Sequence, residues 1–221
     1  QAAKMLGKTQ DPDTGDEEPL GIGLIPFGVS SWFGPLHFIF EYRSIPEGKF
    51  EFSYWNRLYE IERVSFLRNN SNQVVLRTKE SQLGKFGDQN GYFSRMSLDV
   101  GAFFEANMAY NNMVGSLWSN NDKKFILEKN QTFLTSLKLT KSISRIQSAS
   151  AFYQQRNVPN PFKFKYTEST IIGCRLGISM GQGLVLNYIF RRTFRDYNAN
   201  GRIDGNAETI DITSIETSFT F

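Results

Sequence analysis

The stretch IDITSIETSFTF, residues 210–221, decides how this fold is predicted. Ile215, Thr217, Phe219 and Phe221 recur at every second position, which is the spacing of one face of a β-strand. Chain ends usually fray, so an alternating aromatic strand at the last residue indicates that this segment pairs inside a larger sheet. We therefore expect a β-structure that the final strand completes.

The same alternation continues through most of the chain from residue 20 onward. In the last segment Ile210 and Ile212 are out of phase with the residues that follow, so a bulge near Thr213 or Ser214 is predicted. The pattern predicts about ten strands, at residues 20–33, 36–45, 49–60, 91–100, 102–113, 124–139, 142–154, 166–180, 183–195 and 208–221.

The composition excludes several classes of protein. The 221 residues carry 25 basic and 22 acidic side chains, and a net charge of +3 does not favour a nucleic-acid partner. Twenty phenylalanines in a chain with a mean hydropathy of −0.38 suggest apolar residues alternating with polar ones. Cys174 is the only cysteine, which excludes a disulfide framework. No apolar run reaches about 18 residues, so no transmembrane helix is predicted.

The domain organisation is predicted to be simple. Residues 1–19 are rich in Asp, Glu, Gly and Pro and are expected to be a flexible mature N-terminal segment. Residues 20–221 are expected to form one β-barrel.

The spacers between the predicted strands alternate in length. PEGK, VGA, TKS and MGQG are turns, and each precedes a longer connection at 61–90, 114–123, 155–165 or 196–207. Short periplasmic turns and long outer loops are the layout of an outer-membrane barrel. Only the short GP spacer at 34–35 departs from it, and both termini are then expected on the periplasmic side.

The two faces of the strands must be assigned before the barrel can be placed in lipid or in water. A soluble β-barrel or sandwich would turn its aromatic face inward. The length of the aromatic face and the girdle-like aromatics near strand ends favour a membrane barrel instead. The girdle residues are Phe50, Tyr92, Tyr110, Tyr153, Phe194 and Phe221.

At its C-terminus the chain resembles bacterial outer-membrane β-barrel proteins. The segment IETSFTF, with Ile215, Thr217, Phe219 and Phe221 at alternate positions, is similar to the assembly signal of that family. Thr217 departs from the more apolar residue that many relatives carry. The resemblance implies a closed antiparallel transmembrane β-barrel, exported through the periplasm to the outer membrane. It implies as partners the barrel-assembly machinery, the outer-membrane lipids and lipopolysaccharide.

If the aromatic face meets lipid, a charged set faces the lumen, because Lys or Arg at the bilayer midplane costs about 2–4 kcal/mol. Two roles are open to this set: a charge-paired interior that holds the barrel shut, or a constriction that selects solutes. Barrels of about eight strands are filled by side chains, so a wide pore is not expected. The set comprises Glu41, Arg43, Glu51, Arg57, Arg95, Asp99, Glu105, Lys138, Arg175, Arg191 and Glu216.

Two further motifs bear on function. His37 is the only histidine, and no Ser-His or Asp-His motif is visible near it, so we expect an interior residue and no enzyme. In DYNANGRIDGNAE, residues 196–208, the oxygens of Asp196, Asn198, Asn200 and Asp204 have the spacing of a calcium loop. The pattern fails at its last position, where Ala207 stands, and the same residues also suit a hairpin turn.

The polar connections 61–90 and 196–207 are the candidate contacts for lipopolysaccharide or a protein partner. We expect a non-enzymatic outer-membrane barrel that serves as a structural or binding protein or as a subunit of an envelope assembly. A narrow channel for ions or small solutes is the alternative, and a membrane-embedded hydrolase is a third hypothesis. No cofactor is expected apart from the calcium that the loop predicts.

Overall fold

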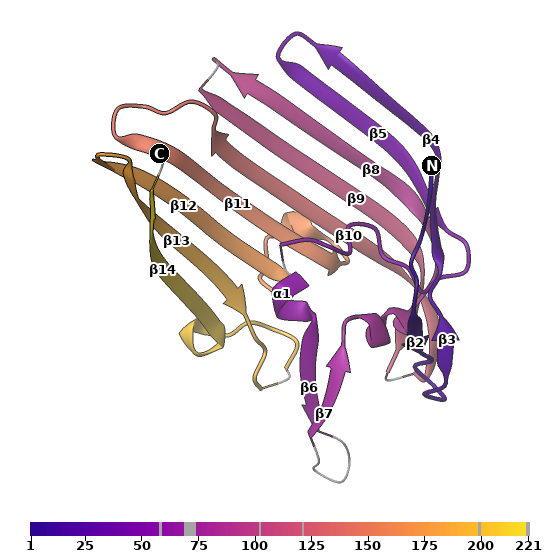
Figure 1. The fold of residues 1–221 in the computed structure, drawn as a ribbon. Helices are drawn as coiled ribbons and strands as arrows, with labels where there is room; N and C mark the ends of the chain where they lie inside the picture. The colour runs from indigo at the N-terminus through magenta and orange to yellow at the C-terminus, as the bar shows by residue number, and fades with distance from the viewer. Residues whose placement is uncertain (58, 69–73, 102, 121, 199, 220–221) are drawn as a thin grey trace. The chain divides into compact units, whose positions relative to one another are not determined.

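The computed structural model describes residues 1–57, 59–68, 74–101, 103–120, 122–198 and 200–219. Its main feature is an antiparallel sheet of ten strands, in the order β1-β4-β5-β8-β9-β10-β11-β12-β13-β14 (Figure 1). The strands are β1 (Ala2–Lys4), β4 (Ile22–Phe33), β5 (Leu36–Ile45), β8 (Phe86–Val100), β9 (Phe104–Ser119), β10 (Lys124–Leu139), β11 (Ile146–Val158), β12 (Thr170–Gly181), β13 (Leu184–Phe194) and β14 (Thr209–Phe219).

The other elements are short. Two hairpins pair β2 (Lys8–Gln10) with β3 (Glu17–Pro19) and β6 (Val64–Arg68) with β7 (Val74–Thr78). The helical elements are α1 (Tyr59–Glu62) and the 3-10 turns η1 (Glu80–Lys85), η2 (Pro161–Lys163) and η3 (Gly205–Glu208). No helix in the described ranges is long and apolar enough to span a membrane.

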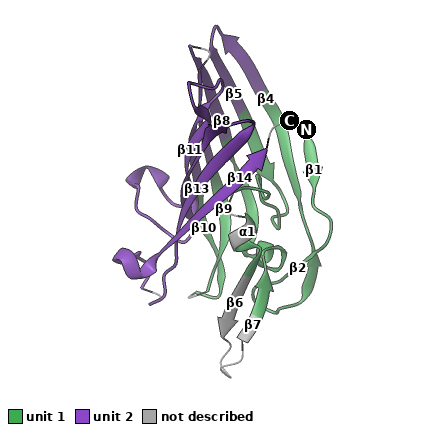
Figure 2. Ribbon diagram, turned by 60° about the vertical axis from the view of Figure 1, so that its left-hand side comes forward, with its two compact units in different colours: residues 1–28, 41–92, 112–130 green, residues 29–40, 93–111, 131–221 purple. Residues whose placement is uncertain are grey.

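The chain divides into two compact units, coloured green and purple in Figure 2. Unit 1 contains residues 1–28, 41–92 and 112–130, and therefore the short hairpins, α1 and η1. Unit 2 contains residues 29–40, 93–111 and 131–221, and therefore all of β11 to β14. Each unit is described below by itself.

The prediction of an all-β fold is confirmed, and so is a large antiparallel sheet, but the predicted strand at 49–60 is wrong. Lys49 and Ser53 have left-handed backbones, with φ of 54° and 58°, which no strand accommodates. Phe50, predicted to lie in a membrane girdle, is instead buried against Ile45 and Met113. Phe50 and Tyr54 follow a strand-like spacing because both rings are buried in unit 1.

The N-terminal segment is folded rather than featureless. Residues 1–19, which the composition predicts to be flexible, include β1, β2 and β3. β1 pairs with β4 through Ala2 and Leu24, and Thr9 of β2 is almost fully buried. β1 thus supplies the tenth strand of the sheet in place of the one predicted at 49–60.

The predicted bulge in the last strand is also wrong. β13 and β14 pair without a shift of register from Leu184 opposite Phe219 to Phe194 opposite Thr209. Ile210 and Ile212 therefore lie on the face opposite Ile215, and no irregularity is needed to form the ladder.

Connections between successive long strands form two alternating groups along the chain, but they do not alternate strictly in length, because 120–123 is shorter than 140–145. Residues 34–35, 101–103, 140–145 and 182–183 form short connections, and residues 46–85, 120–123, 159–169 and 195–208 alternate with them. β14 begins after the connection 195–208 and runs antiparallel to β13. Its C-terminal end therefore lies beside the short connection 182–183, from which β13 begins. β4 begins at the opposite end, whereas the first strand was predicted to begin beside the short turns.

Candidate functional site

In unit 1 the long connection 46–85 covers one face of the surrounding strands. Arg43 and Ile45 of β5 are 8% and 2% exposed, whereas Tyr42 between them is 42% exposed. Met113 of β9 is buried and its neighbour Val114 is not. The polar face predicted to point inward is thus the covered face, and the apolar face is the open one.

Apolar contacts hold this connection in place. Phe50 packs with Ile45 and Met113, and a Cβ atom on Gly23 of β4 would lie only 2.2 Å from the Phe50 ring. A second cluster joins Leu83 and Tyr54 of the connection to Leu20 and Phe86. The Phe50 ring thus lies so close to Gly23 that no side chain would fit between the connection and β4 at this position. The connection thus packs directly on the covered face of unit 1.

A buried lysine lies at the centre of the connection. The Lys79 ammonium is 2.9 Å from a Glu62 carboxylate oxygen and 3.5 Å from one of Glu51, and it donates a 2.8 Å hydrogen bond to the carbonyl of Tyr54. It also lies 4.5 Å from the centre of the Tyr54 ring. Both Lys79 and Glu51 are more than nine-tenths buried. A buried charge pair fixes the arrangement of its neighbours, because separating it leaves an unpaired charge out of water.

The Tyr54 hydroxyl extends this cluster by donating a 2.6 Å hydrogen bond to Glu80. Burial, followed by the bond to Glu80, raises the pKa of Tyr54. Burial alone would raise the pKa of Glu80, but the hydrogen bond from Tyr54 and the Glu80 backbone N–H lower it overall. The tyrosine therefore stays a donor and the glutamate stays an acceptor, which suits a structural contact.

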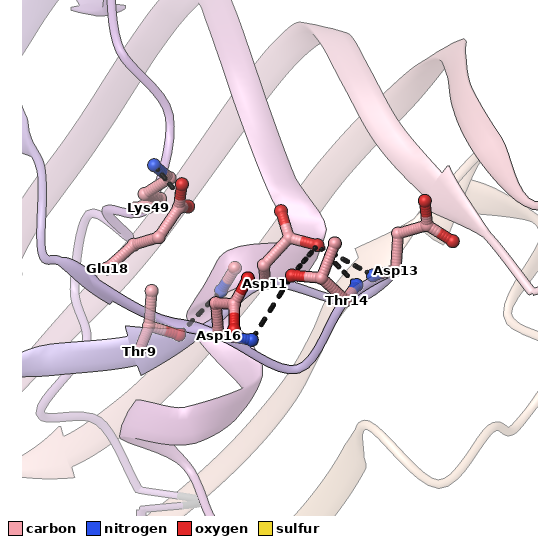
Figure 3. A network of polar contacts seen from close by, with 8 residues as sticks. Thr9, Asp11, Asp13, Thr14, Asp16, Glu18 and Lys49 are labelled. Carbon is pink, nitrogen blue, oxygen red and sulfur yellow. Dashed lines mark hydrogen bonds and ion pairs between the residues drawn. The ribbon is translucent and has the colours of Figure 1, made fainter.

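A small acidic cavity lies beside the N-terminal hairpin. In the hairpin turn Asp11 accepts hydrogen bonds of 2.8 Å from the backbone N–H groups of Asp13 and Thr14 (Figure 3), which lower its pKa. The ion pair between Glu18 and Lys49 ties the hairpin to the long connection. The cavity has a volume of about 370 Å³, and its charged lining is Asp11, Glu18, Glu47, Lys49 and Asp88.

Among the predicted lumen charges of unit 1, Glu41 and Arg43 are paired on one strand. Arg43 makes two hydrogen bonds, of 2.9 and 2.7 Å, to one oxygen of Glu41 two residues away on β5. Glu51 pairs with Lys79, a partner outside the predicted set. Arg57 is exposed in the connection. The partner of Glu51 was missed because Lys79 is distant in sequence and its segment carries no strand pattern.

In unit 2 the predicted charges lie mostly exposed. Within the described residues no ion pair joins Arg95, Asp99 and Glu105; Glu105 accepts from the Asn107 amide at 2.8 Å instead. The remaining members are exposed side chains of strands, at Lys138, Arg175, Arg191 and Glu216. Register places Arg191 opposite Gly173 and Ile212, on one face of β12 to β14. This face carries net positive charge.

His37 has a partner that the sequence did not reveal. Its ring stacks on Trp32 at 3.8 Å, and its Nε2 is 2.8 Å from the Ser30 hydroxyl. The short GP turn returns the chain so that these residues meet. A serine and an imidazole at hydrogen-bond distance are two parts of a nucleophilic site, but such a site also needs a group that orients the base. The structure supplies stacking in that place, which suits a structural role.

The predicted calcium loop is held together by its own side chains. Asp196 accepts from the backbone N–H of Gly201 at 2.7 Å, and the Asn200 amide donates to Asp204 at 2.6 Å. Asn198 accepts from the N–H of Asn200, and the buried Glu208 accepts from that of Asp204. Among the described residues, no group of three His, Cys, Asp or Glu is arranged to hold a metal. Calcium at this loop stays a prediction.

The proposed assembly signal lies on the last described strand. Ile215 and Phe219 are exposed on the same face of β14 as Thr217. Phe221 lies outside the described residues, as does part of the predicted partner connection 61–90. The other predicted partner connection, 196–207, borders a cavity of about 330 Å³ with Tyr166 and Glu168.

Comparison of the chain with protein-family models, with curated proteins and with solved structures gives no match. A proposal of function therefore rests on the geometry and chemistry of the chain itself.

Proposed function

We propose that this chain is a non-enzymatic β-barrel of the bacterial outer membrane whose interior is occupied by its own long connection. It would act as a structural or binding protein or as a subunit of an envelope assembly. The observation that carries the proposal is the difference in solvent exposure between the two faces of the strands. In unit 1 the apolar face is open and the opposite face is covered, which is the reverse of a soluble barrel.

The open face has the height of a membrane-facing band. On β13 the apolar stretch runs from Leu184 to Phe190, and Arg192 ends it in a two-bonded ion pair with Asp211, both bonds 2.7 Å long. The eight steps from residue 184 to residue 192 span about 26 Å along the strand. A strand tilt of about 40° reduces this to about 20 Å, close to the band of about 25 Å in known barrels.

Closure of the sheet into a barrel is part of the proposal. β4 and β14 are the first and last long strands, and because direction alternates between neighbours they run parallel to each other. β1 is antiparallel to β4. A ring closed between β1 and β14 would therefore be antiparallel throughout, with an even number of strands, as bacterial barrels require.

The alternative function is a narrow channel for ions or small solutes. It is favoured by the exposed Lys138, Arg175 and Arg191 on strands of unit 2. The packing of the connection 46–85 on the covered face of unit 1 argues against it, since packed side chains obstruct the passage of water.

Single-channel conductance in planar bilayers tests the proposal, after protease protection has shown that the refolded protein has inserted. Wild type should be silent, and Lys79→Met, which loosens the connection, should produce current. Lys8→Met is the matched control, because Lys8 forms an exposed pair with Glu17 and holds no interior segment. Steady conductance of wild type would establish the channel instead, and failure to insert would refute the membrane assignment.

A further inference from the structure

The connection between β11 and β12 carries an alternating aromatic and basic segment, Pro-Phe-Lys-Phe-Lys-Tyr at residues 161–166. The rings of Phe162, Phe164 and Tyr166 are 50%, 55% and 46% exposed, and Lys163 and Lys165 between them are exposed as well. Neither the assembly signal nor the interior of unit 1 involves this segment, although Tyr166 borders the cavity beside the calcium loop. All of it belongs to unit 2.

The rings of this segment rest on the open face of the strands. The Phe162 ring centre is 5.0 Å from that of Tyr110 and 5.2 Å from that of Phe133. The Phe164 ring is 5.8 Å from that of Tyr153. Their contacts leave Phe133 only 7% exposed, so the segment extends an aromatic surface that the strands begin. Such contacts are favourable packing, yet half of each added ring remains outside.

The backbone of the segment is fixed by buried polar contacts. The side-chain amide of Gln155, which is 2% exposed, donates to the carbonyl of Lys165 at 2.6 Å and to the Thr170 hydroxyl at 3.1 Å. Asn160 accepts from the N–H of Phe162 at 3.0 Å and so begins η2. Phe164 has φ 49° and ψ 31°, a left-handed conformation that is rare for a bulky side chain. Strain of this kind persists where the surroundings impose it, often at binding sites.

The segment also lies at the end of the apolar band. Tyr153 is opposite Ile172, which is opposite Arg192, the residue that ends the band on β13. Tyr166 stacks on Phe194, two residues beyond Arg192, with ring centres 4.5 Å apart. The aromatic rings are therefore at the level where a bilayer passes from acyl chains to headgroups, if the chain is a membrane barrel. Amphipathic rings are enriched at that level.

We propose that residues 161–166 form a binding site for the phosphate headgroups of anionic membrane lipids. The inference rests on the proposed function. Phe162 and Phe164 enter the boundary between acyl chains and headgroups, and the ammonium groups of Lys163 and Lys165 pair with lipid phosphates. Charge complementarity selects this occupant, because the described residues offer neither lysine an ion pair and a membrane surface supplies anions at the right depth.

Spin-labelled lipids test the proposal on the full refolded chain in phosphatidylcholine vesicles. Electron spin resonance measures how strongly labelled phosphatidylglycerol is held at the protein surface relative to labelled phosphatidylcholine. Lys163→Gln/Lys165→Gln should lower this selectivity about five-fold per lysine at low ionic strength. Lys163→Arg/Lys165→Arg should keep it. Lys123→Gln/Lys124→Gln removes the same charge where the connection 120–123 meets β10 and should change the selectivity little.

The outcomes separate the site from the proposed function. Protein that inserts, but whose selectivity is the same with and without the two lysines, overturns this inference and leaves the barrel intact. An equal loss in the 123/124 control overturns it too, because net charge alone would then explain the binding. Inorganic phosphate that displaces the lipid better than chloride of equal ionic strength would identify a free-anion site and refute the lipid. Protein that never inserts refutes both proposals.

Discussion

Replacing Lys79 by Met should release the long connection from the interior of unit 1. The substitution keeps the length and apolar body of the side chain but removes the ammonium that pairs with Glu62 and Glu51 and donates to the Tyr54 carbonyl. It leaves Glu51, 7% exposed, without this cation. Breaking a buried pair by removing one partner costs about 3–5 kcal/mol. The open population of the connection should therefore rise by about two to four orders of magnitude.

Chymotrypsin cleavage of the refolded protein measures this population, since its aromatic and leucine sites are unchanged by the substitution. When closing is faster than cleavage, the cleavage rate is proportional to the open fraction. Lys8→Met, at an exposed pair, should change the rate less than about five-fold. Glu51→Gln combined with Lys79→Met should recover part of the loss, because the carboxylate charge that pairs with Lys79 is then removed as well. An increase below ten-fold for Lys79→Met alone would refute the account of a charge-locked connection.

Four further outcomes are expected. The raised pKa of Tyr54 stabilises the folded protein fully below the unfolded-state pKa of 10.0, and this stabilisation is lost as the pH rises through the folded-state pKa. Wild type should therefore lose stability above about pH 10, and Tyr54→Phe should not. Urea unfolding at several pH values measures the difference. Phe164→Gly should be more stable than Phe164→Ala by about 1 kcal/mol in the free energy of unfolding, because only glycine relieves the left-handed backbone. Its thermal midpoint should therefore be higher, and equal midpoints would contradict the strain. A fluorophosphonate probe should not label wild type more than Ser30→Ala, and selective labelling would show that the contact with His37 is catalytic. Calcium near 10⁻³ M should raise the thermal midpoint of wild type but not of Asp196→Asn, and a calorimetric titration without heat would exclude the loop as a calcium site.

The strand pattern was readable from the sequence wherever one face is covered and the other open. On β5 the residues beside Tyr42 alternate between exposed and covered, as their sequence does. The pattern misled at 49–60, where Phe50 and Tyr54 alternate for a different reason. The left-handed backbones of Lys49 and Ser53 break the strand there, and neither residue type signals such a conformation in advance.

The charged interior was less readable than the strands. Glu41 and Arg43 are two residues apart on one strand, so sequence alone brought them together. Glu51 and Lys79 meet only because the connection folds back on itself, and no local period records that contact. The Ser30 contact of His37 was missed for the same reason, since it depends on how the GP turn orients two strands. The aromatic segment 161–166 had a visible signal, the alternation of rings and lysines, which was read only as part of a long connection.

The placement of the long connection between β5 and β8 sets an order of events during folding. Strands β11 to β14 are joined by the connections 159–169, 182–183 and 195–208. Each strand therefore pairs with a neighbour that is close in the sequence. Pairing β5 with β8 must first close residues 46–85, which costs about 1 kcal/mol more chain entropy than closing 195–208. Long-range pairings form late for this reason. The capture of residues 46–85 is therefore expected among the last steps of folding, after the strands of unit 2 have paired with their neighbours in sequence.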